Sequence, residues 1–569
     1  MRSASSFWDR YAKQRVTRRR LLQAAGAGSV AAGAIVLAGC TGAKDGGTAT
    51  TLPTAAIGPS NQPDILNPGG PPRTGGRYVT ANSANFGAWD PHTGIQVASA
   101  YFPRMYNLLL SQSPTKPDYT FLDLAQSFET PDELTYVFKL RPGVKVAPNN
   151  LGVPERDIDG QDVKTTFERL KTDAATNQYS FASTYIDTVS VEGDTVTIKT
   201  TEPYAWFISR VSSSFNTIPP RELLEGDMSR LDSEGAGGGP YKLISVTEND
   251  VARFVRNTNY YRTDDANGGG RLPYVDELEV RVIFDRATQR TGFLSNQTHQ
   301  YWTESGTEAR GLSDYPIVRE PVFAYISLTM NPKKKPFDDP RVRRAVARAI
   351  DRAQFVERVY GGDARANGLV HWPLGSYALS EDELQSTYQP FDLKEAHQLV
   401  EAVGGITLKM AYPSNTTIQE HGQHLSILVE QMRQAGIEVD EQPQEFSTWV
   451  TAYHDLDYDC NLALNQVYET PELPLLFHTS NGPFGDHTYI QGIGDPEIDA
   501  AAFKANTTLD FDARKNAVHD AQKLIYAKDP MYLPFVSPYV HMAFSKQLKN
   551  IPTGVGTTQY SLTTYWLDV

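Results

Sequence analysis

Cysteine is nearly absent from this chain, with only Cys40 and Cys460 among 569 residues. Cys40 closes an N-terminal export signal, described below, so Cys460 has no partner left for an intramolecular disulfide. One remaining thiol is also too few for a cysteine metal site. Cys460 stands in the run DYDCNLALN, and we predict that its side chain faces a hydrophobic core.

Basic residues are in the minority. Lys and Arg number 53 against 67 Asp and Glu, and the residues before Cys40 hold seven of the former and one of the latter. From Cys40 onward, 46 basic residues therefore face 66 acidic ones, a formal net charge of −20. Nucleic-acid binding needs a basic surface, so we expect no nucleic-acid partner. The acidic excess favours solubility and says little about the charge of a ligand.

Long apolar runs are also missing, with the exception of the 19 uncharged residues 21–39. A helix needs ~20 apolar residues to span a bilayer, but this run is mostly alanine and glycine, which contribute little transfer free energy. It therefore fits an export signal better than an uncleaved anchor helix, which is the alternative. The rest of the chain has no run of membrane-spanning length, so we do not expect a membrane domain there.

The predicted signal carries two motifs, one that indicates the export pathway and one that indicates lipidation and cleavage. TRRRLL at 17–22 resembles the twin-arginine export pattern, and LAGC at 37–40 resembles a bacterial lipobox. We therefore predict a signal peptide over residues 1–39, a lipid on Cys40, and a flexible Gly/Thr/Pro-rich tether over residues 40–74. This predicts a protein held at the outer face of the cytoplasmic membrane, in the periplasm or at the cell surface.

Motifs of known catalytic chemistry are missing as well. There is no Gly-x-Ser-x-Gly nucleophile elbow, and the glycine-rich run at 235–241 lacks the Gly-Lys-Ser/Thr ending of a phosphate loop. His421 and His424 can share a helix face, but two histidines without a third ligand make a weak metal site. We therefore predict no enzyme activity, no cofactor and no metal, with a surface hydrolase as the less favoured alternative.

Strand patterns begin soon after the tether. Residues 74–83 are typical of a first strand after a glycine turn. Residues 135–146 alternate apolar and polar side chains and predict a hairpin that turns at Pro142 and Gly143. Residues 186–204 predict a second hairpin.

Helical patterns follow later in the chain. Residues 338–362 predict one helix, capped by Asp339 and ended by Gly361 and Gly362. Residues 405–446 have the strand, helix, strand order of a βαβ unit. The alternation of the two patterns predicts an α/β protein.

Several segments resemble one known family. LDLAQSFETPDELTYVFKLRPGVKV (122–146), DGQDVKTTFERL (159–170) and LTMNPKKKPFDDPRVRRAVARAIDR (328–352) are similar to landmarks of the peptide/nickel-type solute-binding proteins of ABC transporters, family 5. WDPHTG (89–94) and MRQAGIEV (432–439) are similar to two more. All stand in the family's order, from about residue 74 to the C-terminus.

The resemblance implies a periplasmic-binding-protein-like fold of two α/β lobes that close over a solute. It implies a first lobe at 75–320 with an inserted subdomain at about 110–182, a second lobe at 321–528, and a return to the first lobe at 529–569. The protein would be a monomer that binds a peptide-like or other medium-sized solute and docks on ABC permease subunits. An oligosaccharide or other non-peptide solute is the alternative.

The resemblance also suggests ligand-binding residues. Peptide binders of the family pair the peptide amino group with an Asp beside a Tyr-Asn-Glu-Pro-like loop, which aligns with QVYETPELP (466–474). Val467 falls in the Asp position and Glu469 could substitute, so the peptide interpretation is weakened. Aromatic faces suit sugars, rings and apolar side chains alike. The aromatic residues expected at the pocket edges are Trp89, Tyr101, Phe102, Trp302, Trp372 and Tyr468.

Overall fold

The computed structural model describes residues 64–94, 100–112, 120–225, 228–232, 234–265, 269–321, 324–414, 419–466, 470–480, 493–528, 530–553 and 563–568. The chain divides into two units, Met1–Thr48 and Ala49–Val569, and all described residues belong to the second. The predicted signal and Cys40 lie outside the described residues, as do Tyr468 and Glu469. Within the described part, no helix combines the length and the apolar character that a membrane crossing requires.

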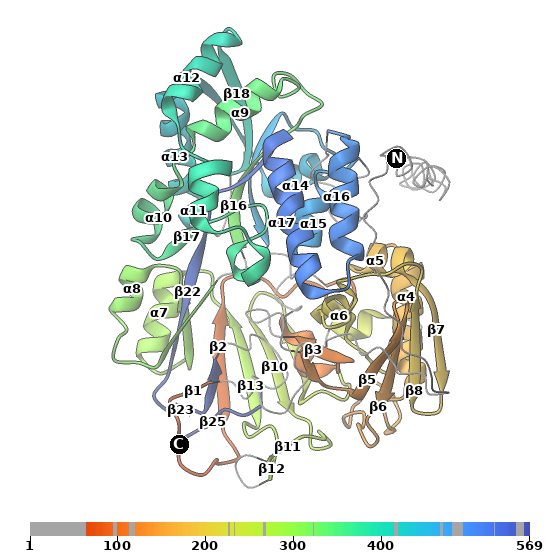
Figure 1. Cartoon of the computed structure of the whole chain (residues 1–569). Coiled ribbons are helices and arrows are strands. Elements are labelled where there is room, and N and C mark those ends of the chain that lie inside the picture. Colours follow the sequence, from red (N-terminus) through yellow and green to blue (C-terminus); the bar gives the residue numbers. More distant parts are fainter. Residues whose placement is uncertain are drawn as a thin grey trace, which may run out of the picture. The chain divides into compact units, whose positions relative to one another are not determined.

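One four-stranded sheet joins distant parts of the chain in the order β2-β13-β10-β9 (Figure 1). β2 (Arg77–Asn82) runs parallel to β13 (Glu277–Val282), and β10 (Val251–Arg256) is antiparallel to both β13 and β9 (Tyr241–Thr247). The short helix α3 (Phe102–Met105) contacts β9. The strand predicted over residues 74–83 is thus confirmed as β2.

A separate antiparallel sheet has the order β5-β6-β8-β7. Its strands are β5 (Ala125–Asp132), β6 (Thr135–Leu140), β8 (Thr195–Thr200) and β7 (Ile186–Glu192). β7 and β8 form the hairpin predicted over residues 186–204, which is confirmed.

The predicted hairpin at Pro142 and Gly143 is wrong. β6 ends at Leu140 and pairs instead with β5, which precedes it, and with β8. Both edges of β6 are therefore already hydrogen-bonded, and no place is left for a returning strand. Val144 and Val146 enter the hydrophobic core from an irregular segment, which explains why they resemble strand residues in sequence.

Two helices cover this sheet. α4 (Gly160–Thr172) begins at a capping box in which Asp159 accepts from the backbone N–H groups of Gln161 and Asp162. α4 contacts β7 and β8, and α5 (Tyr179–Tyr185) contacts α4 and β7. The sheet and its helices lie in and beyond the segment predicted as an inserted subdomain, whose bounds stay a prediction.

The five-stranded sheet has the order β19-β18-β20-β16-β21. β18 (Ile406–Pro413) and β19 (Ile437–Gln444) are parallel and flank α13 (Gln419–Gln434), so the predicted βαβ unit is confirmed. β20 (Cys460–Gln466) and β16 (Ala324–Met330) are antiparallel, and β21 (Tyr532–Pro534) closes the edge. Cys460 is fully buried in this core, as predicted.

The helix predicted over residues 338–362 is two helices. α9 (Pro340–Ala349) is capped by Asp339, and α10 (Arg352–Tyr360) ends at Gly361 in the left-handed conformation. Between them Ile350 is extended, and the Asp351 side chain accepts from the backbone N–H of Ala353. Asp351 therefore caps a second helix, a signal that the continuous apolar periodicity conceals.

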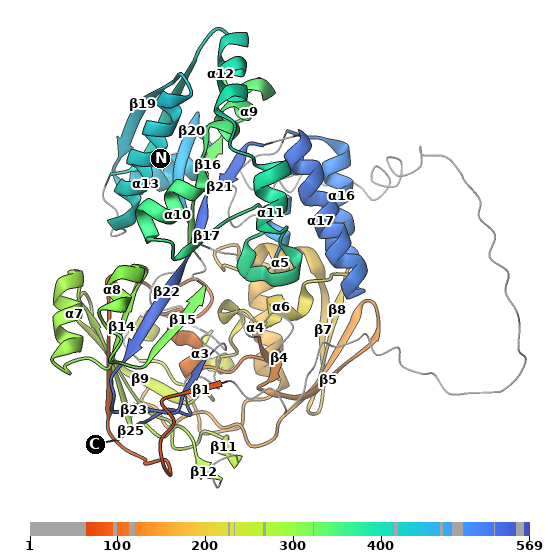
Figure 2. The same ribbon diagram turned by 60° about the vertical axis from the view of Figure 1, so that its left-hand side comes forward.

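One long strand, β22 (Val536–Phe544), passes from one group of strands to another (Figure 2). It follows β21 of the five-stranded sheet and first pairs with β17 (Ala364–Ala366). Its later residues pair with β15 (Ile317–Pro321) and β14 (Gln300–Thr303). β22 therefore connects the segment predicted as the second lobe with strands predicted to belong to the first.

Three helices near the C-terminus share a core with an earlier segment. They are α15 (Glu472–Leu476), α16 (Pro496–Thr507) and α17 (Phe511–Lys528). Buried residues from all three belong to the same hydrophobic cluster as α6 (Phe207–Val211). The side chains at this junction include the buried ion pair between Arg210 and Glu472.

Candidate functional site

A buried ion pair links α6 to α15. Glu472 is fully buried, and its Oε2 accepts from Nη2 of Arg210 at 2.7 Å and from Nε at 3.2 Å. The Tyr204 hydroxyl donates to the same oxygen at 2.6 Å. Burial alone would lower the pKa of Arg210, but the Glu472 carboxylate raises that pKa above its ordinary value.

Hydrogen bonds and ring contacts continue this junction. Trp206 Nε1 donates to Oδ1 of Asn506 at 2.9 Å, and the backbone N–H of Ala205 donates to the Asn506 carbonyl at 2.8 Å. Trp206 also lies edge-on to Tyr377, and the Arg514 guanidinium lies over its ring. By the predicted bounds, residues 204–211 belong to the first lobe and their partners to the second.

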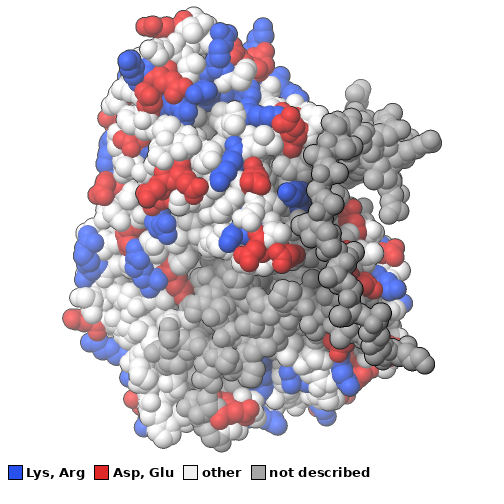
Figure 3. All heavy atoms as spheres, viewed as in Figure 1, with Lys and Arg blue, Asp and Glu red and all other residues white. Residues whose placement is uncertain are grey.

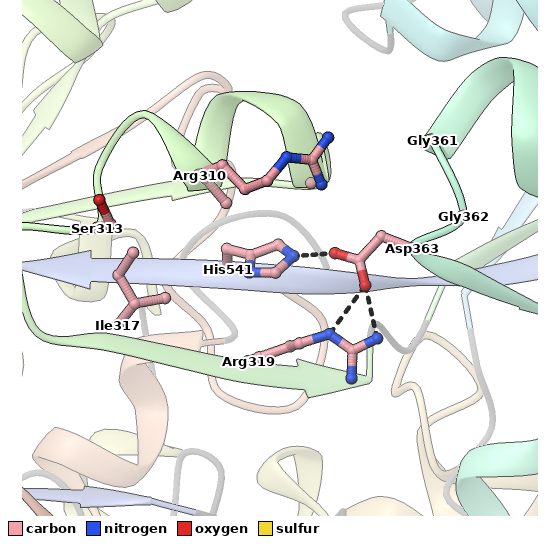
Figure 4. Close-up of a pocket in the computed structure, with 10 residues that line it drawn as sticks. Arg310, Ser313, Ile317, Arg319, Gly361, Gly362, Asp363 and His541 are labelled. Carbon is pink, nitrogen blue, oxygen red and sulfur yellow. Dashed lines mark hydrogen bonds and ion pairs between the residues drawn. The ribbon is translucent and has the colours of Figure 1, made fainter.

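A pocket of about 380 Å³ lies beside β22 (Figure 4). Its lining comes from α8 (Gly306–Arg310), β15, β22 and the turn after α10. The lining residues are Gly306, Ala309, Arg310, Ser313, Ile317, Arg319, Gly361, Gly362, Asp363 and His541. Its volume is at the small end of the range for small-molecule sites.

Asp363 is held from two strands in this pocket. Its Oδ1 accepts from Nε and Nη2 of Arg319 at 2.8 and 2.5 Å, and its Oδ2 contacts Nε2 of His541 (Figure 4). Partial burial would raise the pKa of Asp363, but the hydrogen bonds from Arg319 and His541 bring it below its ordinary value. The cluster fastens the turn after α10 to β15 and β22, next to the crossing strand.

Three of the predicted aromatic residues come together. Trp89, only 1% exposed, packs against Phe86, Tyr101 and Phe254, with ring centroids 5.6, 6.5 and 5.9 Å away. Phe102 follows Tyr101 at the start of α3 and is fully buried. These residues form part of the core beneath the first sheet, and their predicted role in ligand binding stays a prediction.

Two other predicted residues lie along β22, apart from that cluster. Trp302 of β14 is half-buried, stands opposite Met542 of β22, and is covered by the Arg286 guanidinium at 4.4 Å from its ring centroid. Trp372 is half-buried against Tyr539 of β22, with ring centroids 5.0 Å apart. The structure therefore does not bring all the predicted aromatic residues to one place.

Several residues of these sites have no distinctive signal in the sequence. Arg210 and His541 stand in no motif, and Glu472 lies in the segment 466–474 but is not one of its predicted binding residues; each gains its partner from a segment more than a hundred residues away. Long-range pairing of this kind is invisible to local periodicity. The described residues contain no group of three or more His, Cys, Asp or Glu side chains that could hold a metal ion.

Charge is mixed on the surface. On the face shown in Figure 3, acidic and basic side chains are interspersed across the described parts. Neither sign dominates that part of the face, so the acidic excess of the chain is not gathered there into one field.

The fold is that of the two-lobed periplasmic binding proteins. The dipeptide-binding protein of Pseudoalteromonas sp. SM9913, in complex with Met-Leu, superimposes with a TM-score of 0.73 at 20% identity, covering 87% of this chain and 100% of that one. AgaA of A. tumefaciens R10, in complex with agropinic acid, gives a TM-score of 0.72 at 18% identity, covering 87% and 99%. The predicted fold class is therefore confirmed.

The family follows from the sequence comparison. Residues 121–484 match the model of the bacterial extracellular solute-binding proteins, family 5. The chain belongs to this family, and it is a solute-binding protein of the ABC-transporter type, as predicted. The probable ABC transporter periplasmic-binding protein SapA of Escherichia coli K12 is 23% identical over 480 residues, which cover 79% of this chain and 84% of that protein.

Proposed function

We propose that this protein is a lipid-anchored receptor that closes over a peptide-like or other medium-sized solute and delivers it to an ABC permease. The observation that carries the proposal is the buried junction between α6 and α15–α17. A binding protein closes because solute contacts both lobes only when they are shut. Residues from both predicted lobes meet in this junction, as a closed form requires.

Two observations bear on which class of solute the protein binds. The structural neighbours include complexes with a dipeptide and with agropinic acid, so the same fold accommodates peptide and non-peptide solutes. Val467 takes the place of the Asp that holds a peptide amino group in the family's peptide binders. A solute other than a classical free peptide therefore remains the second candidate.

The anchor belongs to the same proposal. A lipid on Cys40, followed by the Gly/Thr/Pro-rich tether, would keep a monomeric receptor close to its permease and raise its effective concentration there. The protein would then act outside the cytoplasmic membrane, as a binding protein and not as an enzyme.

Native mass spectrometry of the full-length protein from its host tests this function. We expect an unchanged solute of moderate mass, bound at one molecule per chain. Release of a covalently converted product instead would contradict the receptor and favour the surface hydrolase. Uptake of the identified solute by host cells should also fall when the gene is deleted, and unchanged uptake would count against delivery to a permease.

A further inference from the structure

The pocket beside β22 lies on the face of that strand opposite to Trp302, a predicted ligand-binding residue. Neighbouring residues of a strand point to opposite faces of the sheet. His541 lines the pocket and pairs with Arg319, which also lines it, whereas the next residue of β22, Met542, pairs with Trp302. A molecule in this pocket would therefore not contact Trp302.

Two parts of the chain that are predicted to belong to different lobes build this pocket. α8 and Arg319 precede the predicted boundary after residue 320, and the turn at 361–363 follows it. The two parts are closely packed, because a Cβ placed on Gly306 of α8 would lie only 2.9 Å from Oδ2 of Asp363. A molecule bound in the pocket would thus contact both predicted lobes.

Arg310 brings a cation to this pocket without a counter-charge. Its Nη2 donates to Oγ1 of Thr307 at 2.8 Å, and no ion pair joins it to any residue that the structure describes. Its side chain extends from α8 toward the side of the pocket that carries Asp363 (Figure 4). Arg310 is exposed, so its guanidinium is accessible to a molecule that enters from the solvent.

The other charges around the pocket are already engaged or stand apart. Both oxygens of Asp363 have partners, Arg319 on Oδ1 and His541 on Oδ2. The exposed Glu357 lies beside the glycine turn that follows α10, but among the described residues no ion pair joins it to Arg310. Arg310 is therefore the cation of this pocket that an added anion can engage.

The rest of the lining suits a small acid. Ser313, which is exposed, adds a hydroxyl group, and Ala309 and Ile317 add apolar surface. A guanidinium binds carboxylate and phosphate oxygens through strong, charge-assisted hydrogen bonds, and a hydroxyl group can donate to the same oxygens. The pocket volume of about 380 Å³ is that of a site for a small molecule.

We propose that this pocket is a binding site for a small acid anion, a carboxylate or a phosphate, held by Arg310 and Ser313. It is separate from the site of the transported solute. Since its lining comes from both predicted lobes, the bound anion stabilises the contact between α8 and the turn after α10. Arg310 supplies the charge that selects an anion, and Ser313 supplies a further hydrogen bond.

Titration of the full-length protein with inorganic phosphate and with succinate tests this site. Isothermal titration calorimetry in chloride buffer at constant ionic strength measures binding, and hydrogen exchange locates it. We expect at least one of the two acids to bind and to slow amide exchange at 306–319 and 361–363. Arg310→Gln should weaken this binding about tenfold or more, because it removes the cation. Ser313→Glu should abolish it, because the new carboxylate repels the anion.

Arg271→Gln is the matched control. Arg271 is also exposed and forms no ion pair with a described residue, and its Nη1 donates to the Thr258 carbonyl at 2.6 Å. This variant should bind the acids like the wild type. Binding of phosphate alone or of succinate alone supports the site and distinguishes the two kinds of acid. Absence of binding above the chloride background, or equal binding by the wild type and Arg310→Gln, overturns the site and leaves the receptor function standing.

Discussion

Arg210 and Glu472 are 262 residues apart in the chain and form a buried ion pair with an N–O distance of 2.7 Å. The Glu472 side chain is 1% exposed and that of Arg210 17%. Because both side chains are largely removed from water, each charge depends on the other for stabilisation. Separating them would leave a poorly solvated charge without a counter-charge. If α6 and α15 separate when the receptor opens, the ion pair must break and both charged groups must be hydrated instead. The pair therefore opposes the separation of α6 from α15.

Replacing one partner of this pair should favour the open form. Glu472→Gln leaves the Arg210 charge without a counter-charge, and breaking a buried pair in this way costs about 3–5 kcal/mol. We expect a lower midpoint of urea unfolding, a larger radius of gyration by small-angle X-ray scattering, and weaker binding of the resident solute. The double variant Arg210→Met with Glu472→Leu removes both charges and should recover most of the stability.

An exposed ion pair provides the control for this experiment. Lys334 and Asp457 lie 2.8 Å apart, with side chains 35% and 80% exposed. Asp457→Asn should change the free energy of unfolding by less than about 1 kcal/mol. A Glu472→Gln protein as stable and as compact as this control would show that the Arg210–Glu472 pair does not hold the junction.

Asp363 should make the protein less stable in acid. Its pKa is lower in the folded protein than in the unfolded chain, so its contribution to stability is complete above the ordinary Asp pKa, near ~4. That contribution is lost as the pH falls toward the folded pKa, because the protonated carboxyl no longer pairs with Arg319. Urea unfolding of the wild type and of Asp363→Asn between pH 7 and pH 3 measures the contribution of ionised Asp363 to the free energy of unfolding. The difference between the two proteins should be largest at pH 7 and shrink in acid, and a constant difference would contradict the assignment.

The sequence predicted the parts of the fold that depend on neighbours in the chain. The β7–β8 hairpin and the βαβ unit of β18, α13 and β19 follow from periodicity and turn residues within some forty residues. The hairpin at Pro142 and Gly143 failed because β6 takes its partners from β5 and β8. Local alternation identifies a strand but cannot say which edge is already occupied.

The candidate site was less predictable for the same reason. Trp89, Tyr101 and Phe102 were expected at the edges of a ligand pocket, and the structure places all three in a hydrophobic core. Aromatic residues serve packing and binding equally well, so their type alone cannot distinguish the two. Asp363 and His541 are in contact only because β22 pairs with β15 and β17. No sequence motif in either segment indicates this contact.

Cys460 should be inert in the folded protein. Its side chain is fully buried in the five-stranded sheet, and burial raises the pKa of its thiol. The thiolate that reacts with Ellman's reagent is therefore scarce, and the reagent cannot reach it. We expect almost no reaction at pH 8 in the native state and rapid reaction of this thiol in 6 M guanidinium chloride. The variant Cys40→Ser, in which Cys460 is the only thiol, gives the cleanest measurement, and rapid labelling of that native protein would contradict the burial.

The same substitution tests the proposed anchor. Cys40→Ser removes the only sulfur in LAGC that can carry a lipid, and cleavage at a lipobox follows lipidation, so we expect this variant to carry no lipid mass and to keep residues 1–39. Intact mass spectrometry of the wild type should show a chain that begins at Cys40 with an added lipid mass. A variant with both Arg18 and Arg19 changed to Lys should instead stay in the cytoplasm with its signal attached, because the twin-arginine route requires that pair. A wild-type protein that keeps residues 1–39 and carries no added lipid mass would show that this segment is an uncleaved anchor helix.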